Sequence, residues 1–359
     1  MTGILQHSAV LSYVVAIGVT ATTISALKHL APRLGLVDTP GGHHMHNMPT
    51  PLVGGIGMFF GFALSLLILQ TPLSTMLPLF AGCALLVVVG VFDDLHELST
   101  RARFGAQIIA ASLMAVWGDV TLRDLGHLVS ADIVDLGMWA VPLTVFATVG
   151  VINALNMSDG MDGQGGSVAL IAFGFLVLVT VSAGRETDVI NLILLWLITG
   201  TFLIFNLRLP GRRRAAVFMG DAGSMFLGFV LACYLINLSQ GDQRVITPVT
   251  ALWFIALPLY DTVGVMWRRI LEGSSPFGAD RTHYHHLLSG LGLGVNQSLL
   301  VIVVSAVVLG SIGLAGQLLH VSESLMFFVF LGLFLAYFLI TGVAVKRMRG
   351  LAPLRCSGI

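Results

Sequence analysis

The sequence predicts an all-α fold, a polytopic integral membrane bundle of about eleven transmembrane helices. Three observations support this fold class: charged residues make up only 10% of the 359 positions, apolar residues make up 56%, and the mean hydropathy is +0.92. A soluble domain usually carries about 25% charged residues. Because no polar stretch is long enough to fold separately, we expect one transmembrane domain at residues 1–345, followed by a basic tail at 346–359.

Apolar runs of transmembrane length recur along the chain, and a bilayer core requires roughly 20 such residues per helix. The first run predicts a retained helix rather than a signal peptide, because no Lys or Arg precedes it. Gly54, Gly55 and Gly57 predict close packing between helices. The predicted spans cover residues 7–27, 51–70, 73–92, 104–118, 137–155, 166–184, 188–206, 216–237, 247–267, 297–318 and 322–345.

The basic residues predict the orientation of these spans, because cytoplasmic loops are enriched in Lys and Arg. With the N-terminus placed outside, fifteen of the eighteen basic residues fall in inner loops or in the C-terminal tail. The outer loops then hold only Arg123, Arg185 and Arg244. We therefore expect a cytoplasmic C-terminus. The same arrangement places the conspicuous aspartates and histidines at the cytoplasmic face.

Asp93 and Asp94 end the third predicted span. Adjacent carboxylates at the point where a helix meets water can hold a divalent cation or position one proton acceptor. The alternative is a helix end whose charges simply reach the lipid headgroups.

A second group of polar residues recurs every three positions at the end of the fifth predicted span. Its members are Asn153, Asn156, Asp159 and Asp162. This spacing gathers amides and carboxylates into one small volume, which suits a metal-bound phosphate and the edge of a base. The run lacks the twelve-residue pattern of a calcium loop. Helix capping would require one such residue rather than four.

Phe218 and Asp221 open the eighth predicted span, among small residues that allow a ligand to approach the backbone. An acid at this position is also a common helix cap. Four arginines lie just upstream, at positions 208 and 212–214. They could bind diphosphate or serve only as a positive anchor on the inner side.

A loop rich in basic groups follows the ninth predicted span. It contains Arg281, His283, His285 and His286. Such groups could bind phosphate or, as neutral imidazoles, a transition metal. Hard carboxylates dominate elsewhere and the cysteines form no CxxC pair, so phosphate with Mg²⁺ is the better interpretation. The earlier cluster of His43, His44 and His46 is either a second phosphate-binding loop or an interfacial loop.

Together these groups describe one inner-face site with carboxylates for Mg²⁺ and cations for phosphate. Phosphoryl transfer uses this equipment, and a site within a helical bundle favours a lipid-borne substrate. An ion or metal transporter is the alternative of another class, but it would require ionisable groups near the bilayer midplane and preferably inverted repeats. The sequence indicates neither, because its acids and histidines cluster at one surface. The net charge of zero gives no support to nucleic-acid binding.

The ordered motifs resemble the polyprenyl-phosphate N-acetylhexosamine-1-phosphate transferases over nearly the whole chain. The matching segments are residues 35–38, 51–55, 92–94, 153–163, 217–224, 275–277 and 280–287. The last is similar to the bacterial branch that uses UDP-N-acetylglucosamine. The resemblance implies transfer of GlcNAc-1-phosphate to undecaprenyl phosphate, with release of UMP, in the bacterial inner membrane. Another UDP-N-acetyl sugar is the alternative substrate, since a loop motif does not distinguish two sugars that differ by one hydroxyl group.

The resemblance also implies roles for individual residues. Asp221 would be the main Mg²⁺ ligand, with Asn156 nearby, and Mn²⁺ is the alternative ion. Asp93 would accept a proton from the attacking lipid phosphate or position it, and Asp94 would support Asp93. Asp159 would shape the diphosphate pocket.

The remaining implied roles concern the nucleotide sugar. Asp162 and Phe218 would hold the uracil, and Asn206 matches another nucleotide-side position. Asn153 would share in the diphosphate pocket. Diphosphate and sugar would be bound by Arg281, His283, His285 and His286. The product would start a surface polysaccharide such as O antigen, common antigen or a teichoic acid linkage, and the resemblance allows a homodimer.

Overall fold

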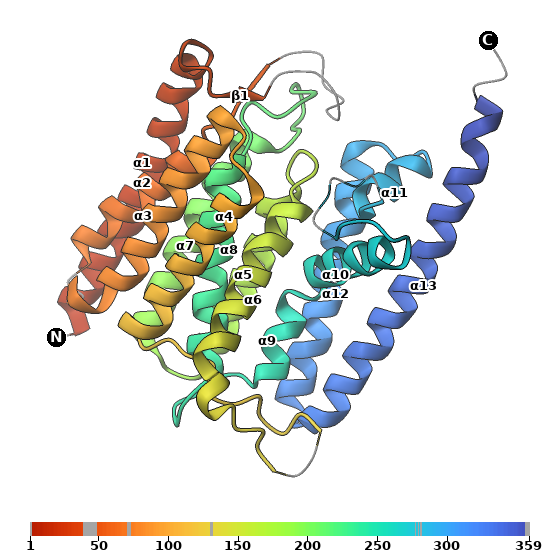
Figure 1. Ribbon diagram of the computed structural model, residues 1–359. Helices are drawn as coiled ribbons and strands as arrows, with labels where there is room; N and C mark the ends of the chain where they lie inside the picture. The colour runs from red at the N-terminus through yellow and green to blue at the C-terminus, as the bar shows by residue number, and fades with distance from the viewer. Residues whose placement is uncertain are drawn as a thin grey trace.

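The computed structural model describes residues 2–38, 49–69, 73–129, 132–276, 278, 280 and 282–355. Within these ranges the chain is a bundle of α-helices, most of which share one general direction (Figure 1). The helices are α1 (Thr2–Leu34), α2 (Gly54–Ile68), α3 (Leu73–His96), α4 (Thr100–Ser112), α5 (Ala140–Ser158), α6 (Gln164–Ser182), α7 (Glu186–Asn206), α8 (Gly220–Ser239), α9 (Pro248–Phe254), α10 (Ala256–Leu271), α11 (Tyr284–Gly290), α12 (Val295–Leu318) and α13 (Glu323–Arg355). The all-α prediction is confirmed.

Eight of the described helices are long and apolar enough to cross a membrane. They are α1, α3, α5, α6, α7, α8, α12 and α13. Two other predicted spans match shorter elements: α2 has 15 residues, and α4 continues into a π-helical turn at Leu113–Trp117. The chain is therefore a multi-pass membrane protein.

The ninth predicted span, residues 247–267, is not one straight helix. It consists of α9 and α10, which meet at an angle of 81°. Pro258 accounts for the break, because proline has no N–H to donate to the carbonyl of Phe254 and is tolerated only in the first turn of a new helix. Ile255 takes a non-helical conformation between the two helices. Hydropathy does not reveal this change of direction.

Helix α8 lies at the centre of the bundle, with 17 of its 20 residues buried. It packs against α2, α3 and α5. Glycines allow these contacts: a Cβ atom at Gly55 would collide with the backbone of Gly223, and one at Gly90 would collide with the backbone of Ala222. The predicted close packing at Gly55 is confirmed.

Two short strands lie beside the start of α8. β1 (Val37–Asp38) pairs antiparallel with β2 (Thr50–Pro51), and Leu52 bridges to Phe218. The N–H groups of Gly54 and Gly55 donate to the carbonyls of Phe218 and Met219 at 3.0 and 2.9 Å. These bonds fix the backbone that leads into Asp221.

Candidate active site

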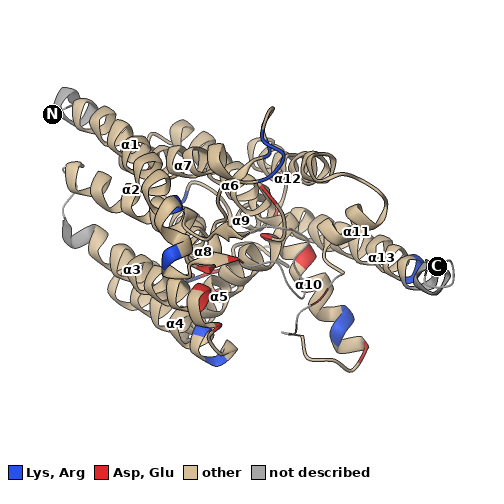
Figure 2. Cartoon of the chain, turned by 90° about the horizontal axis from the view of Figure 1, so that it is seen from above, with Lys and Arg blue, Asp and Glu red and all other residues tan. Residues whose placement is uncertain are grey.

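Acidic side chains gather near the middle of one end of the bundle, where α3 and α5 end and α8 begins. Figure 2 shows this end from above, with red acidic positions near the centre and blue basic positions mostly farther out. The carboxylates of Asp93, Asp94 and Asp221 interact electrostatically with one another. These three carboxylates are thus brought together from two distant parts of the chain.

Asp94 caps the N-terminus of α8. Its Oδ1 accepts the N–H of Asp221 at 2.8 Å, and its Oδ2 accepts the N–H of Ala222 at 3.4 Å. The first N–H groups of a helix have no partner within the helix, so a carboxylate there stabilises it. Gly220 makes the approach feasible, because its φ of +72° and the nearby Asp94 carboxylate both exclude a side chain.

Asp221 faces Asn156. The Asn156 Nδ2 donates to Asp221 Oδ1 at 2.6 Å and to Ser224 Oγ at 2.8 Å. This leaves the Asn156 carbonyl oxygen and the second Asp221 oxygen as hard oxygen donors of the kind that Mg²⁺ prefers. Among the described residues no group of three or more His, Cys, Asp or Glu has metal-holding geometry. The oxygen atoms of Asp221 and Asn156 are of the type that Mg²⁺ takes as ligands.

Asp93 is buried, with 4% of its surface exposed. Its partners lie on α4 and in the short segment that precedes α4. Its Oδ1 accepts the N–H of Leu98 at 2.7 Å, and its Oδ2 lies 3.2 Å from Arg103 Nη1. An ion pair at a buried carboxylate offsets part of the cost of removing that charge from water. Arg103 was not assigned a role from the sequence.

Asp159 lies in the turn after α5, and its Oδ1 accepts the N–H of Gly165 at 2.9 Å. The pKa of Asp159 is raised to about 6, mainly by burial and also by the carboxylates of Asp221 and Asp162, against the opposing effect of the Gly165 N–H. Asn153 is turned toward α4, where its Nδ2 donates to Gln107 Oε1 at 2.6 Å. In the structure it therefore supports the packing of α5 on α4.

Asp162, Asn206 and the segment before α8 form one bonded unit. Asp162 Oδ2 accepts from Arg208 Nε at 2.6 Å and from the N–H of Ala215 at 3.0 Å. The buried amide of Asn206 accepts the N–H of Gly163 at 2.8 Å and donates to the carbonyl of Val217 at 2.9 Å. These bonds hold the turn after α5 against the backbone that carries Phe218.

The histidine loop, residues 282–286, lies against this turn. A side chain at Gly160 would collide with the ring of His285, so the two loops are in contact. The pKa of His285 is lowered to about 3, mainly by burial and also by the neighbouring His286. His285 is thus a neutral imidazole at physiological pH. Arg281 and the His43–His46 cluster lie outside the described residues.

Sequence reasoning missed Asp261, which contacts His283 at 2.9 Å. A signal was present, because Asp261 is an acid inside the predicted span 247–267 and intramembrane acids are commonly functional. The partners of Asp261 belong to the site end of the bundle.

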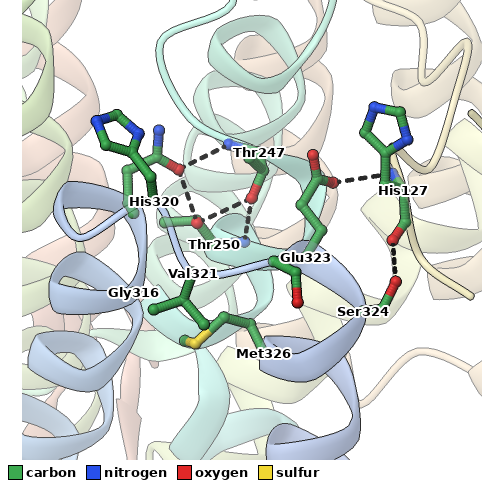
Figure 3. A pocket seen from close by; sticks show the side chains of 11 residues that line it. His127, Thr247, Thr250, Gly316, His320, Val321, Glu323, Ser324 and Met326 are labelled. Atoms are coloured by element: carbon green, nitrogen blue, oxygen red, sulfur yellow. Dashed lines mark hydrogen bonds between the residues drawn. The ribbon is translucent and has the colours of Figure 1, made fainter. Parts of the chain in front are cut away.

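A cavity of about 550 Å³ lies at the opposite end, between the loop before α5 and the ends of α9, α12 and α13 (Figure 3). Gln317 Oε1 accepts from the N–H of Thr247 at 3.2 Å and from Thr250 Oγ1 at 3.0 Å, and Glu323 accepts the N–H of His127 at 3.1 Å. Its polar groups largely satisfy one another. This cavity is separate from the acidic site.

Comparison with known proteins identifies the family. A family model described as glycosyl transferase family 4 matches residues 76–239, which include Asp93, Asn156 and Asp221. A protein of Yersinia pestis is 37% identical over 321 residues, covering 89% of this chain and 87% of its own. The chain belongs to glycosyl transferase family 4.

Other members of the family agree. A protein of Escherichia coli K12 is 35% identical over 323 residues, with 89% and 86% of the two chains covered. One of Haemophilus influenzae is 35% identical over 319 residues, with 88% and 89% covered. All three are named undecaprenyl-phosphate alpha-N-acetylglucosaminyl 1-phosphate transferase. The resemblance drawn from the motifs is confirmed, and the chain is a phosphoglycosyl transferase.

Proposed function

We propose that this family member transfers N-acetylglucosamine 1-phosphate from UDP-N-acetylglucosamine to undecaprenyl phosphate. The products are undecaprenyl-diphospho-N-acetylglucosamine and UMP. The observation that carries the proposal is the meeting of Asp94, Asn156 and Asp221 at the start of α8, in the same region as a histidine loop that touches Gly160. The names of the three relatives support the same substrates.

The reaction forms one phosphorus–oxygen bond and breaks another. An oxygen of the lipid phosphate attacks the β-phosphorus of the nucleotide sugar. The bond from that phosphorus to the bridging oxygen breaks, and its electron pair leaves with UMP. The lipid phosphate is already anionic near neutral pH, so the protein's main task is to bring two anions together. Asp93, which forms an ion pair with Arg103, would orient the attacking phosphate.

Asp221 and Asn156 would hold Mg²⁺, or Mn²⁺ in its place, through oxygen atoms. A bound ion of this kind neutralises charge that develops on the transferred phosphoryl group. Asp94 contributes by fixing the backbone of Asp221. Asp159 would lie beside the diphosphate.

The other side of the site would take the nucleotide and sugar. Asp162 and Phe218 would contact the uracil, and Asn206 would hold their two segments together. His283, His285 and His286 would contact the diphosphate and sugar, with Arg281 added from the sequence. A neutral His285 would serve as a hydrogen-bond donor rather than as a cation.

The reaction would take place at the cytoplasmic face of a bacterial inner membrane. It would be the first membrane step of a surface polysaccharide of the O antigen, common antigen or teichoic acid type. The clustering of Lys and Arg in the loops on the site side supports this orientation.

The test measures UMP released by the purified protein from undecaprenyl phosphate, Mg²⁺ and a panel of UDP-sugars. We expect UMP from UDP-N-acetylglucosamine, and we expect Asp221→Ala to reduce the rate by roughly 10²-fold or more, since it removes the principal metal ligand. UMP from a different sugar alone would correct the substrate. No UMP from any sugar, with folded protein, would contradict the proposal.

A further inference from the structure

Asp261 is a buried carboxylate on α10, with 2% of its surface exposed. It accepts three hydrogen bonds from two other parts of the chain, which lie beside α10 at the site end (Figure 1). His283 Nδ1 lies 2.9 Å from its Oδ2, and the Tyr284 N–H and the Tyr337 hydroxyl each donate to its Oδ1 at 2.9 Å. Burying a charge is costly unless such donors surround it, so this arrangement points to a specific use.

The bond to Asp261 selects the tautomer of His283. An ionised carboxylate only accepts hydrogen bonds, so the proton of a neutral His283 resides on Nδ1. The other nitrogen, Nε2, is then the one free to contact a ligand. Pairing a histidine with a carboxylate also fixes the plane of the ring.

The hydrogen bond from the Tyr284 N–H to Asp261 also restrains the position of His285. Tyr284 is the first residue of α11, and Asp261 holds its N–H. His285 follows directly, with its ring nearly parallel to that of His283 at 9° and 6.0 Å between centroids. Because His285 packs against Gly160, the position of Asp261 determines how the histidine loop rests on the turn that carries Asp159.

Arg268 on α10 makes a second connection between the histidine loop and α13. Its Nη1 donates to Thr341 Oγ1 at 2.8 Å, and its Nη2 donates to the carbonyl of Thr282 at 3.3 Å. Helix α13 therefore supports the loop through Tyr337 and Thr341. The histidine loop is thus bonded to α10, and its His285 ring contacts Gly160 in the turn after α5.

We propose that Asp261 is a positioning residue for phosphoryl transfer, which acts through His283 to present Nε2 to the diphosphate of the nucleotide sugar. The inference rests on the proposed function, because it assigns the group that the histidine loop binds. Asp261 itself contacts neither substrate.

Asp261→Asn tests this assignment with little change of shape. The amide oxygen can still accept from Tyr284 and Tyr337, but the amide nitrogen faces His283 Nδ1 as a donor and forces the proton to Nε2. We expect kcat to fall on the order of 10- to 100-fold, with a smaller change in KM, as for other carboxylates that orient a histidine. In a His283→Ala background the same change is expected to add less than about twofold, because Asp261 acts through His283.

Tyr260→Phe is the matched control. The Tyr260 hydroxyl donates to the carbonyl of Phe330 at 2.7 Å, so it joins α10 to α13 without touching the histidine loop. We expect its kcat to stay within about twofold of wild type. Thermal unfolding in detergent reports whether each variant is folded. If Asp261→Asn is unfolded, Tyr337→Phe removes one donor more gently and should lower kcat only when His283 is present.

Three results would overturn the assignment. The first is a wild-type kcat in Asp261→Asn, and the second is a kcat in the double variant with His283→Ala that falls by the product of the two single losses. The third is a loss of kcat in Tyr260→Phe equal to that in Asp261→Asn. Each requires an active wild type. A wild type that releases no UMP from any UDP-sugar would instead remove the proposed function, and this inference with it.

Discussion

At the scale of single residues, the site holds three carboxylates that are bonded to a helix N-terminus or to an arginine, and a fourth, Asp221, that lies beside two of them. Asp94 is bonded to the N-terminus of α8, Asp93 to Arg103, and Asp162 to Arg208. Asp221 accepts a hydrogen bond from the Asn156 amide, and its carboxylate also interacts with those of Asp93 and Asp94. Adjacent negative charges repel unless a cation lies between them. The Mg²⁺ that we propose at Asp221 would relieve this repulsion.

His285 gives a prediction about pH and stability. Its pKa lies at about 3 in the folded protein because burial and His286 disfavour the charged ring. The ordinary value is about 6.5, so between these values the unfolded chain binds the extra proton. The stabilisation is present above about pH 6.5 and is lost as the pH falls toward 3. Asp159, with its pKa raised to about 6, acts in the opposite direction over part of that window.

The measurement compares thermal unfolding at about pH 7 and about pH 5 for wild type and His285→Asn. We expect acidification to lower the Tm of wild type by roughly a few degrees more than that of the variant. His320→Asn, at an exposed position on the opposite end, is the control and should behave as wild type does. An identical acid response in all three proteins would show that His285 does not contribute.

At the scale of elements, the distance between α3 and α8 determines the geometry of the acids. Gly90 lies where α3 crosses the start of α8, and a Cβ atom there would collide with Ala222 and Asp221 backbone atoms. Gly90→Ala should push the helices apart and draw Asp94 away from the N–H of Asp221. Overpacking of this kind costs about 1–3 kcal/mol. A misplacement of about 1 Å can cost on the order of 10²-fold in rate.

Gly150→Ala is the matched control, because it is also a helical glycine but has open space around its Cβ position. We expect Gly90→Ala to lower both Tm and kcat, and Gly150→Ala to leave kcat unchanged. Both are measured with the UMP assay and by thermal unfolding. Normal activity of Gly90→Ala would mean that α3 and α8 can separate without disturbing Asp94.

Much of this arrangement could be predicted from the sequence, because hydropathy and polar motifs are local features. The positions of most helices and the convergence of Asp93, Asn156 and Asp221 follow from run lengths and from which end of a span a motif occupies. The bend at Pro258 and the role of Asp261 could not be predicted in the same way. Both depend on which helices meet, since Asp261 finds its partners 22 and 76 residues away.

The ion-pair partners of the acidic residues also could not be predicted from local sequence patterns. The four arginines near position 210 look alike in sequence, yet Arg208 alone among them has a described ion pair with Asp162. Asn153 fits the three-residue spacing of its motif, but its amide bonds to Gln107 on α4. Spacing indicates which residues share a side of a helix, and not which neighbour lies across from each of them.

At the scale of the whole molecule, one end carries the acidic site and most of the basic loops, and the other carries the cavity of Figure 3. The asymmetry of Lys and Arg predicts that the site end faces the cytoplasm, where nucleotide sugars occur. Arg213 is exposed at the site end, and Asp242 is exposed in the loop between α8 and α9 at the opposite end. These two positions allow the orientation to be tested directly.

Single cysteines at these positions would be labelled in intact cells with a membrane-impermeant maleimide, in a background where Cys356 is replaced by Ser. Cys83 and Cys233 are buried and can remain. We expect Asp242→Cys to react in intact cells and Arg213→Cys to react only after the membrane is opened. The reverse pattern would place the acidic site outside and remove its access to cytoplasmic UDP-sugars. Because neither residue lies in the proposed catalytic machinery, UMP release from both variants can verify that the labelled protein is the active one.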